Sequence, residues 1–193
     1  MKGNVYTSRA KVQRVILFIN PMKKHALELG EEIRARLDSQ GIEINTIKLK
    51  NKNIPKLNGH YNIAFSLGGD GTVLSAARCM APLGVPVFPV NLGTFGFIAG
   101  IQCSEWQDVF DLYRAGNALV SRRLMLEIWV ERKGIEILRA CCLNEVVISS
   151  FGIAKIINLS VSLAEDRQKK SPNEKIFDLG SYRSDGLIIS TPT

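Results

Sequence analysis

The sequence lacks several features that define whole classes of protein. No run of 18 or more apolar residues occurs, which argues against a membrane-spanning helix. Only two histidines are present, and the four cysteines form no CxxC pair and have no histidine nearby. This spacing argues against a zinc site and favours reduced thiols in a cytoplasmic protein. At 193 residues, the chain is long enough for one large domain or two small ones.

Acidic residues are scarce in the N-terminal part of the chain. Residues 1–60 contain 12 Lys or Arg and 5 Asp or Glu, whereas the other residues contain 13 of each. A basic surface attracts anions, including nucleic acids. Because no aromatic stacking pattern or nucleic-acid motif accompanies the charge, we interpret it as a solvated face and expect no nucleic-acid partner. The first apolar run ends at Asn20 and Pro21, which indicates a strand rather than a signal peptide.

Strands and helices alternate over the first 119 residues. Apolar runs predict strands at 12–20, 42–49, 62–67 and 85–90, and periodic apolar positions predict helices at 21–41, 72–84 and 104–116. Two prolines in 85–90 predict an edge strand or a strand end. Ser104 and Gln107 predict a capping box at the start of the third helix. The alternation predicts a parallel sheet with helices on both sides.

After residue 120 the pattern changes to short strands at hairpin spacing. Segments 124–131, 135–148 and 154–163 are rich in apolar residues that alternate with polar ones, and a turn at 132–134 joins the first two. The polar stretch 165–175 predicts a loop. We therefore expect an α/β domain at 1–119 and a mainly antiparallel, β-sandwich-like domain at 120–193. The last strand would leave a sheet edge unpaired, so we expect this β domain to be incomplete.

The stretch SLGGDGT, residues 66–72, lies between a predicted strand and a predicted helix. Gly68, Gly69 and Gly71 remove side chains from the turn, where backbone N–H groups and a helix N-terminus favour phosphate. The pattern is neither a P-loop nor a dinucleotide-binding fingerprint. Asp70 would repel phosphate unless a metal or a hydroxyl group lay between them, and such an acid suits phosphoryl transfer. The structural alternative is a plain turn capped by Asp70 or Thr72.

A second glycine-rich motif, NLGTFGFIAG at 91–100, also follows a predicted strand. The carboxyl edge of an open α/β sheet is where such folds bind ligands. Glycines allow close approach there, and Phe95 or Phe97 could stack on a base. The alternative is a glycine loop whose phenylalanines belong to the core.

Two short polar motifs precede strands in the second half of the chain. Asn144 carries both a donor and an acceptor, which suits recognition of a base edge, and Glu145 suits ribose hydroxyls or a metal. Asp185 precedes Gly186 before the final strand. Both motifs are also typical of ordinary turns.

Together the four motifs closely resemble the NAD kinase family. They are GGDGT at 68–72, NLGTFGF at 91–97, NEVVI at 144–148 and DGLIISTPT at 185–193. GGDGT alone also resembles lipid and sugar kinases, whereas the other three motifs point to NAD kinases. The resemblance implies an N-terminal α/β domain of the GGDGT-kinase type and a C-terminal NAD-binding β domain. It implies phosphorylation of NAD at the adenosine 2′-hydroxyl to give NADP, with ATP or polyphosphate as donor, Mg²⁺ or another divalent cation, and a homo-oligomer at full length.

The resemblance also implies roles for individual residues. Asp70 would engage and activate the 2′-hydroxyl, while a phosphate loop would consist of Gly68, Gly69, Gly71 and Thr72. Contacts with NAD would come from Asn91 and Phe97 (adenine pocket), Asn144 (adenine), Glu145 (ribose) and Asp185 (nicotinamide end). No residue is assigned as a metal ligand.

The end of the chain departs from the family pattern. Members continue past STPT into a GSTAY segment, so we expect this chain to be truncated at Thr193. Two alternatives to an NAD kinase therefore stay open. One is a truncated, non-catalytic nucleotide-binding remnant, and the other is a lipid or sugar kinase of the GGDGT type.

Overall fold

The computed structural model describes residues 4–6, 11–49, 57, 59–93, 96–152, 155–164 and 175–192. Contacts divide the chain into two compact units, one reaching to Leu143 and the other spanning Asn144–Pro192. Helices occur only in the first unit among the described residues. The predicted α/β part followed by antiparallel β structure is therefore confirmed. Most of the predicted loop at 165–175 lies outside the described residues.

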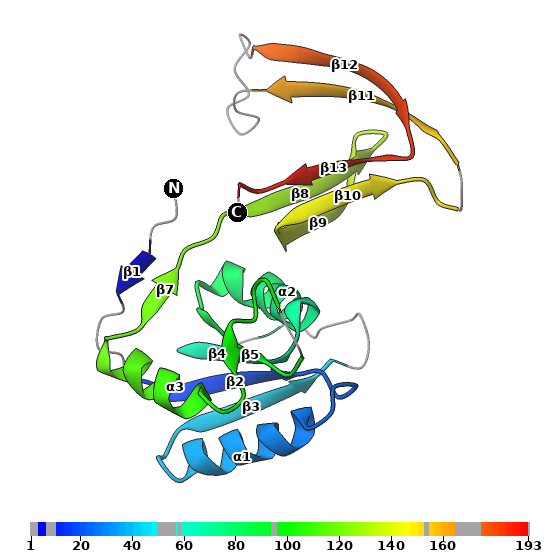
Figure 1. Cartoon of the computed structure of the whole chain (residues 1–193). Coiled ribbons are helices and arrows are strands. Elements are labelled where there is room, and N and C mark those ends of the chain that lie inside the picture. Colours follow the sequence, from blue (N-terminus) through cyan, green and yellow to red (C-terminus); the bar gives the residue numbers. More distant parts are fainter. Residues whose placement is uncertain are drawn as a thin grey trace. The chain divides into compact units, whose positions relative to one another are not determined.

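A five-stranded parallel sheet forms the centre of the first unit (Figure 1). Its strands, in spatial order, are β3 (Glu43–Lys48), β2 (Arg14–Ile19), β4 (Ile63–Gly68), β5 (Val87–Asn91) and β6 (Ile101–Gln102). Strands β2 and β4 are almost wholly apolar because both of their faces are covered. The two prolines predicted an edge strand or a strand end here; β5 is not an edge, because β6 pairs with its last two residues, Val90 and Asn91.

Three α-helices cover the two faces of this sheet. They are α1 (Ala26–Asp38), α2 (Asp70–Met80), which continues into a 3₁₀ turn at Ala81–Leu83, and α3 (Trp106–Ala115). Apolar residues of α1 and α3 share a core with Val15, Leu17 and Ile19 of β2. The alternate β2 residues, Ile16 and Phe18, pack with α2. The predicted arrangement of helices on both sides of the sheet is confirmed.

Phe65 of β4 is the centre of an aromatic cluster beneath α3. Its ring centroid lies 4.6 Å from that of Phe88, 5.3 Å from Phe110 and 6.2 Å from Trp106. The tilted and edge-on arrangement of these rings is favourable for their electrostatic quadrupoles, and the pairs bury large apolar areas. They attach α3 to the sheet next to the strands that carry the glycine motifs.

The predicted capping box of α3 is wrong. The N-cap residue is Glu105 rather than Ser104, and no side chain caps the helix. Gln107 instead donates from Nε2 to Glu32 of α1, whose Oε1 also accepts the Trp106 indole N–H. A tertiary contact with α1 has therefore replaced the local cap.

Short antiparallel strands complete the first unit. Strand β1 (Asn4–Tyr6) pairs with β7 (Leu119–Ser121), and β8 (Met125–Arg132) pairs with β9 (Ile135–Leu143). Lys133 and Gly134 both have positive φ and form the two-residue turn between β8 and β9, as the sequence predicted. Helix α2 packs against β9, which is why the first compact unit extends to Leu143. The domain boundary between residues 119 and 120 stays a prediction.

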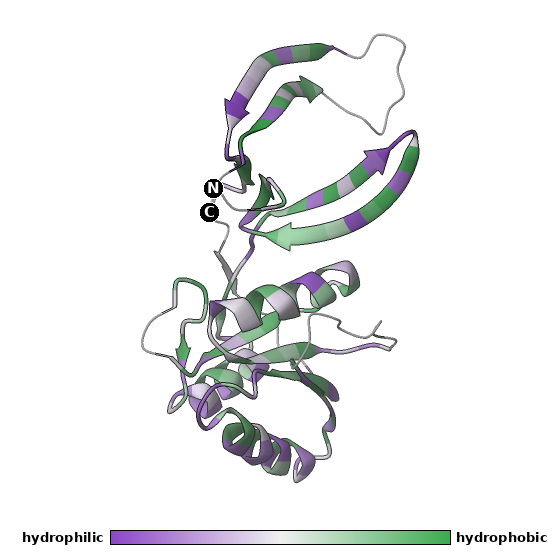
Figure 2. Ribbon diagram, turned by 90° about the vertical axis from the view of Figure 1, so that its right-hand side faces the viewer, coloured by the Kyte–Doolittle hydropathy of each residue, from purple (hydrophilic) through white to green (hydrophobic). Residues whose placement is uncertain are grey.

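The second unit consists of two antiparallel pairs. Strand β10 (Glu145–Ser149) pairs with β13 (Gly186–Ser190), and β11 (Ile157–Ala164) pairs with β12 (Ile176–Ser184). Hydrophilic and hydrophobic residues alternate along the longer antiparallel strands (Figure 2). This alternation is typical of strands that bury one face.

Candidate functional site

The carboxyl ends of β2, β4 and β5 meet at one edge of the parallel sheet, because all three strands run in the same direction. Backbone hydrogen bonds continue beyond the strands. Asn20 N–H donates to the Leu67 carbonyl at 3.1 Å, and Leu92 N–H donates to the Gly68 carbonyl at 2.8 Å. The segments after β2 and β5 therefore flank the glycine turn that follows β4.

The glycine turn is closely packed where it leaves β4. A Cβ on Gly68 would lie 2.9 Å from Cβ of Thr72 and 3.3 Å from Cβ of Asn20, so only glycine fits. Gly69 is the N-cap residue of α2, and no side chain caps this helix. The alternative of a turn capped by Asp70 or Thr72 is therefore wrong. The first N–H groups of α2 are free of side-chain acceptors, as an anion site requires.

Asp70 joins the two glycine motifs. Its Oδ1 accepts the N–H groups of Ile98 and Ala99, both at 3.1 Å, and its Oδ2 accepts the N–H of Phe97 at 3.0 Å. A Cβ on Gly96 would lie 2.6 Å from Asp70 Oδ1 and 3.3 Å from Cβ of Ala99. Gly96 therefore lets the loop approach the carboxylate closely. Sequence spacing alone did not predict this contact.

The ionised form of Asp70 is favoured by these three donors. Partial burial alone would raise its pKa, but the hydrogen bonds from Ala99, Ile98 and Phe97 together hold the pKa of the carboxyl below its ordinary value. A carboxylate offers about four lone-pair sites, and three are in use. Within the described part of the chain, Oδ2 accepts only the Phe97 N–H, so it could also accept a hydrogen bond from a hydroxyl group.

Thr72 and Asn91 are both buried beside this edge. Thr72 is 3% exposed, and its Oγ1 has no hydrogen-bond partner among the described residues. Asn91 is equally buried, and its Oδ1 accepts the N–H of Gly93 at 2.8 Å. Asn91 thus shapes the loop, and its role in an adenine pocket stays a prediction. The Phe97 side chain is fully exposed, which leaves it available for stacking on a base. Phe95 lies outside the described residues.

The remaining predicted residues lie in the second unit. Asn144 has a positive φ of 73°, and its carbonyl accepts both the N–H and the hydroxyl of Thr191. Its side-chain Oδ1 is buried and has no hydrogen-bond partner among the described residues. Glu145 is exposed and pairs with Ser190 at one end of the β10–β13 ladder. Asp185 adjoins Gly186 at the other end, about 14 Å away at the usual strand rise. The structure brings Asn144 and Glu145 together but separates them from Asp185.

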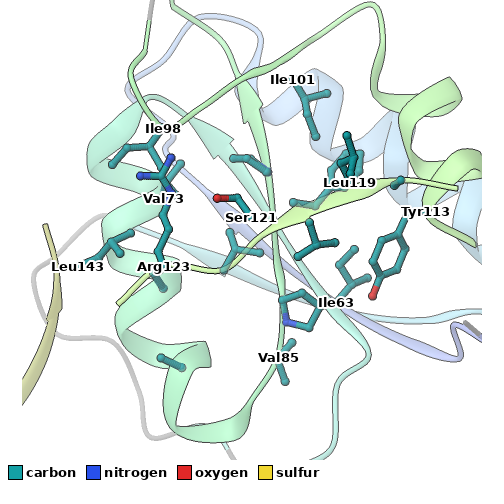
Figure 3. A pocket seen from close by; sticks show the side chains of 18 of the residues that line it. Ile63, Val73, Val85, Ile98, Ile101, Tyr113, Leu119, Ser121, Arg123 and Leu143 are labelled. Atoms are coloured by element: carbon teal, nitrogen blue, oxygen red, sulfur yellow. The ribbon is translucent and has the colours of Figure 1, made fainter. Parts of the chain in front are cut away.

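A cavity of about 430 Å³ lies elsewhere in the first unit (Figure 3). Its lining is mostly apolar and comes from α2, β5 and the segment around β7, with Tyr113, Ser121 and Arg123 as polar members. None of the predicted site residues lines it. The candidate site is therefore the polar edge of the sheet rather than this cavity.

The described residues provide neither a metal-binding cluster nor a membrane-spanning helix. They contain no group of three or more His, Cys, Asp or Glu side chains that could hold a metal ion. No helix within them is long and apolar enough to cross a membrane. The four cysteines are all described, and none forms a disulfide.

Lys23 was not predicted as a site residue, yet it lies at the same edge. Its Nζ is 3.8 Å from the position that a Cβ on Gly93 would take. The available signal was PMKK directly after the first strand, in the basic N-terminal part of the sequence. Spacing alone does not show that the exposed Lys23 side chain reaches the loop after β5.

Comparisons with known proteins agree with this geometry. The family profile described as the ATP-NAD kinase N-terminal domain matches residues 48–118, which include both glycine motifs. The NAD kinase of Treponema denticola is 39% identical over 183 residues, covering 94% of this chain and 61% of the relative. Both matches support membership of the NAD kinase family. The NAD kinase of Nitratidesulfovibrio vulgaris (strain DP4) is 34% identical, covering 94% of this chain and 58% of the relative.

A solved structure with the same fold matches nearly the whole chain. The crystal structure of yeast NADH kinase complexed with NADH matches with a TM-score of 0.76 at 18% identity, covering 98% of this chain and 63% of that one. The chain spans about six-tenths of the length of the curated NAD kinases that it matches. The activity and substrates of the whole protein are therefore inferred below.

Proposed function

We propose that this protein transfers a phosphoryl group from ATP or polyphosphate to the adenosine 2′-hydroxyl of NAD, giving NADP. The observation that carries the proposal is the junction at Asp70, where one carboxylate connects the GGDGT turn to the NLGTFGF loop. In a member of the NAD kinase family, this junction provides a phosphate site and a hydroxyl acceptor side by side.

In this proposal the donor phosphates bind over Gly68, Gly69 and Gly71, against the uncapped N-terminus of α2. The 2′-hydroxyl donates to Asp70 Oδ2. As the hydroxyl oxygen bonds to the terminal phosphorus, the bond from phosphorus to the leaving phosphate oxygen breaks, and the hydroxyl proton passes to Asp70. A carboxylate with a lowered pKa is a weak base, so we infer that this proton moves late, as in loose phosphoryl-transfer transition states.

NAD recognition is assigned to the other motif residues. The exposed ring of Phe97 would stack on adenine, with Asn91 shaping the loop that carries it. The unpartnered Oδ1 of Asn144 would accept a hydrogen bond from the adenine amino group. Glu145 would bind ribose hydroxyls, and Asp185 would contact the nicotinamide end.

The remaining parts of the proposal concern the metal and the cellular setting. Asp70 accepts hydrogen bonds from three backbone N–H groups, and no acidic cluster among the described residues provides a dedicated metal cage. Mg²⁺ or a similar cation would therefore be held mainly by the donor phosphates, which is its usual mode in kinases. We further propose that the protein is a homo-oligomer at full length and that it is cytoplasmic.

The test measures NADP formation and NAD binding together. Purified chain is incubated with NAD, Mg²⁺ and either ATP or polyphosphate, and NADP is detected by an NADP-specific dehydrogenase. Parallel reactions replace NAD by a lipid alcohol or a sugar phosphate, and calorimetry measures NAD binding. NADP formed from NAD supports the proposal. Turnover of the lipid or sugar instead would favour the alternative kinase class, and NAD binding without NADP would favour the non-catalytic remnant. Neither binding nor turnover would overturn the proposal.

A further inference from the structure

We propose that Lys23, in the segment between β2 and α1, binds the phosphate groups of the phosphoryl donor together with the N-terminus of α2. This inference rests on the proposed function for its biological meaning, but the anion site itself can be tested without any enzyme activity. The sequence motifs do not include Lys23.

The backbone around Lys23 is built to hold it at the edge of the sheet. Asn20 Oδ1 accepts the N–H of Met22 at 3.0 Å, and the Asn20 carbonyl accepts the N–H of Lys23 at 3.1 Å. The Lys23 carbonyl in turn accepts the N–H of Ala26, the first residue of α1. Asn20 is itself tied to the end of β4 through Leu67. The lysine therefore stands on a hydrogen-bonded turn that is fixed to the strand carrying the glycine motif.

The direction of the Lys23 side chain follows from the strand order. Strand β4 lies between β2 and β5, so a side chain that starts after β2 and ends near Gly93, after β5, must cross the end of β4. The glycine turn begins at that end, with Gly68 as the last residue of β4. The Lys23 ammonium group is thus held above the turn that we assign to the phosphates.

The charge at this point is not neutralised within the described part of the chain. None of the ion pairs there includes Lys23. The nearest acid of the motif, Asp70, points towards the backbone N–H groups of Phe97, Ile98 and Ala99, which partly compensate its charge. An unpaired ammonium group beside an uncapped helix N-terminus attracts a multivalent anion.

A second observation supports an anion at this place. The hydroxyl of Thr72, in the first turn of α2, is buried without a partner and faces Gly68. Buried hydroxyl groups without a partner are rare and costly. A bound phosphate oxygen, reached by a small shift of the turn, would accept its proton. The ammonium group of Lys23, the N–H groups at the start of α2 and the hydroxyl group of Thr72 together match the donor set that proteins use for polyphosphates.

The experiment measures binding of inorganic tripolyphosphate by calorimetry at low salt, with Lys23→Met, Lys23→Arg and the neighbouring Lys24→Met as matched control. Lys24 is also exposed and forms no ion pair among the described residues. We expect Lys23→Met to weaken binding about tenfold, since a charge-assisted contact contributes at least that factor. Lys23→Arg should stay within about threefold, and Lys24→Met within about twofold. Urea midpoints should be alike for all variants.

Two outcomes would overturn the inference: equal weakening by Lys23→Met and Lys24→Met, or no weakening by either. The proposed function is judged separately. Tripolyphosphate binding that depends on Lys23, without NADP formation, would contradict the proposed kinase activity and support the anion site. If NADP forms and Lys23→Met changes neither tripolyphosphate binding nor the KM for ATP, the proposed kinase activity is supported and Lys23 is excluded from the phosphate site. Where both hold, Lys23→Met should raise the KM for ATP and not that for NAD.

Discussion

The carboxylate of Asp70 accepts the backbone N–H of Ala99 at 3.1 Å, across 29 residues of sequence. With the parallel contacts to Phe97 and Ile98, it makes the first turn of α2 and the loop after β5 a single structure. The residue that we assign to the acceptor hydroxyl is therefore also the residue that positions the base-binding loop.

Replacing Asp70 by Asn tests both roles at once. The amide nitrogen cannot accept a hydrogen bond, so at least one N–H contact is lost, and we expect the free energy of unfolding to fall by about 1–3 kcal/mol. NADP formation should fall about 100-fold or more, because the proton acceptor is gone. The KM for NAD should rise less than tenfold. Equal losses in kcat and in NAD affinity would show that Asp70 only holds the loop.

The control for this variant is Asp108→Asn. Asp108 is also in the first turn of a helix, α3, but it is exposed. Urea denaturation and NADP formation should be close to those of the unmodified chain. A similar loss of stability in both variants would attribute the effect to the helix dipole rather than to the loop.

The stability of the chain should depend on pH through Asp70. Its pKa is lower in the folded state than the ordinary aspartate value of about 3.9. The stabilisation of the folded state by the Asp70 carboxylate is therefore fully present above about pH 4, and it is lost as the pH falls through the folded-state pKa. Urea midpoints measured between pH 7 and pH 2.5 should fall less steeply below pH 4 for Asp70→Asn than for the unmodified chain. Parallel curves would refute the contribution of Asp70.

Gly96→Ala should disturb the same junction from the loop side. The added Cβ would lie 2.6 Å from Asp70 Oδ1, so the loop must move and its hydrogen bonds must weaken. We expect a loss of about 1–3 kcal/mol in the free energy of unfolding and a large loss of NADP formation. Gly100→Ala is the matched control, because its Cβ would meet nothing within 4 Å. The junction is unimportant if both alanine variants are equally stable and active.

Asn144→Gly separates conformation from chemistry in the second unit. Asn144 has a φ of 73°, which glycine adopts without strain, so the variant should fold with little change in its melting temperature. The amide that we assign to adenine is lost, and the KM for NAD should rise about tenfold. Asn144→Ala is predicted to lose stability as well, because alanine rarely adopts positive φ. An unchanged KM in the glycine variant would remove Asn144 from the adenine site.

Local patterns predicted the elements well and their ends less well. The buried face of α1, with Ala26, Leu29, Ile33 and Leu37, follows from helical periodicity and is confirmed. The predicted start of this helix at residue 21 was too early, because the Asn20 turn delays it to Ala26. The predicted cap at Ser104 was wrong. Gln107 instead donates to Glu32, which lies 75 residues earlier, and no local pattern encodes such a contact.

The sequence by itself determined the parallel α/β order, the glycine turn and the four motifs, because periodicity and glycine spacing act through neighbouring residues. Only the tertiary structure decided what Asp70 and Lys23 contact. Asp70 accepts N–H groups that lie 27 to 29 residues after it, and Lys23 reaches Gly93 across a strand between them. Both contacts depend on the strand order, because side chains from different loops meet only where the carboxyl ends of their strands lie next to each other.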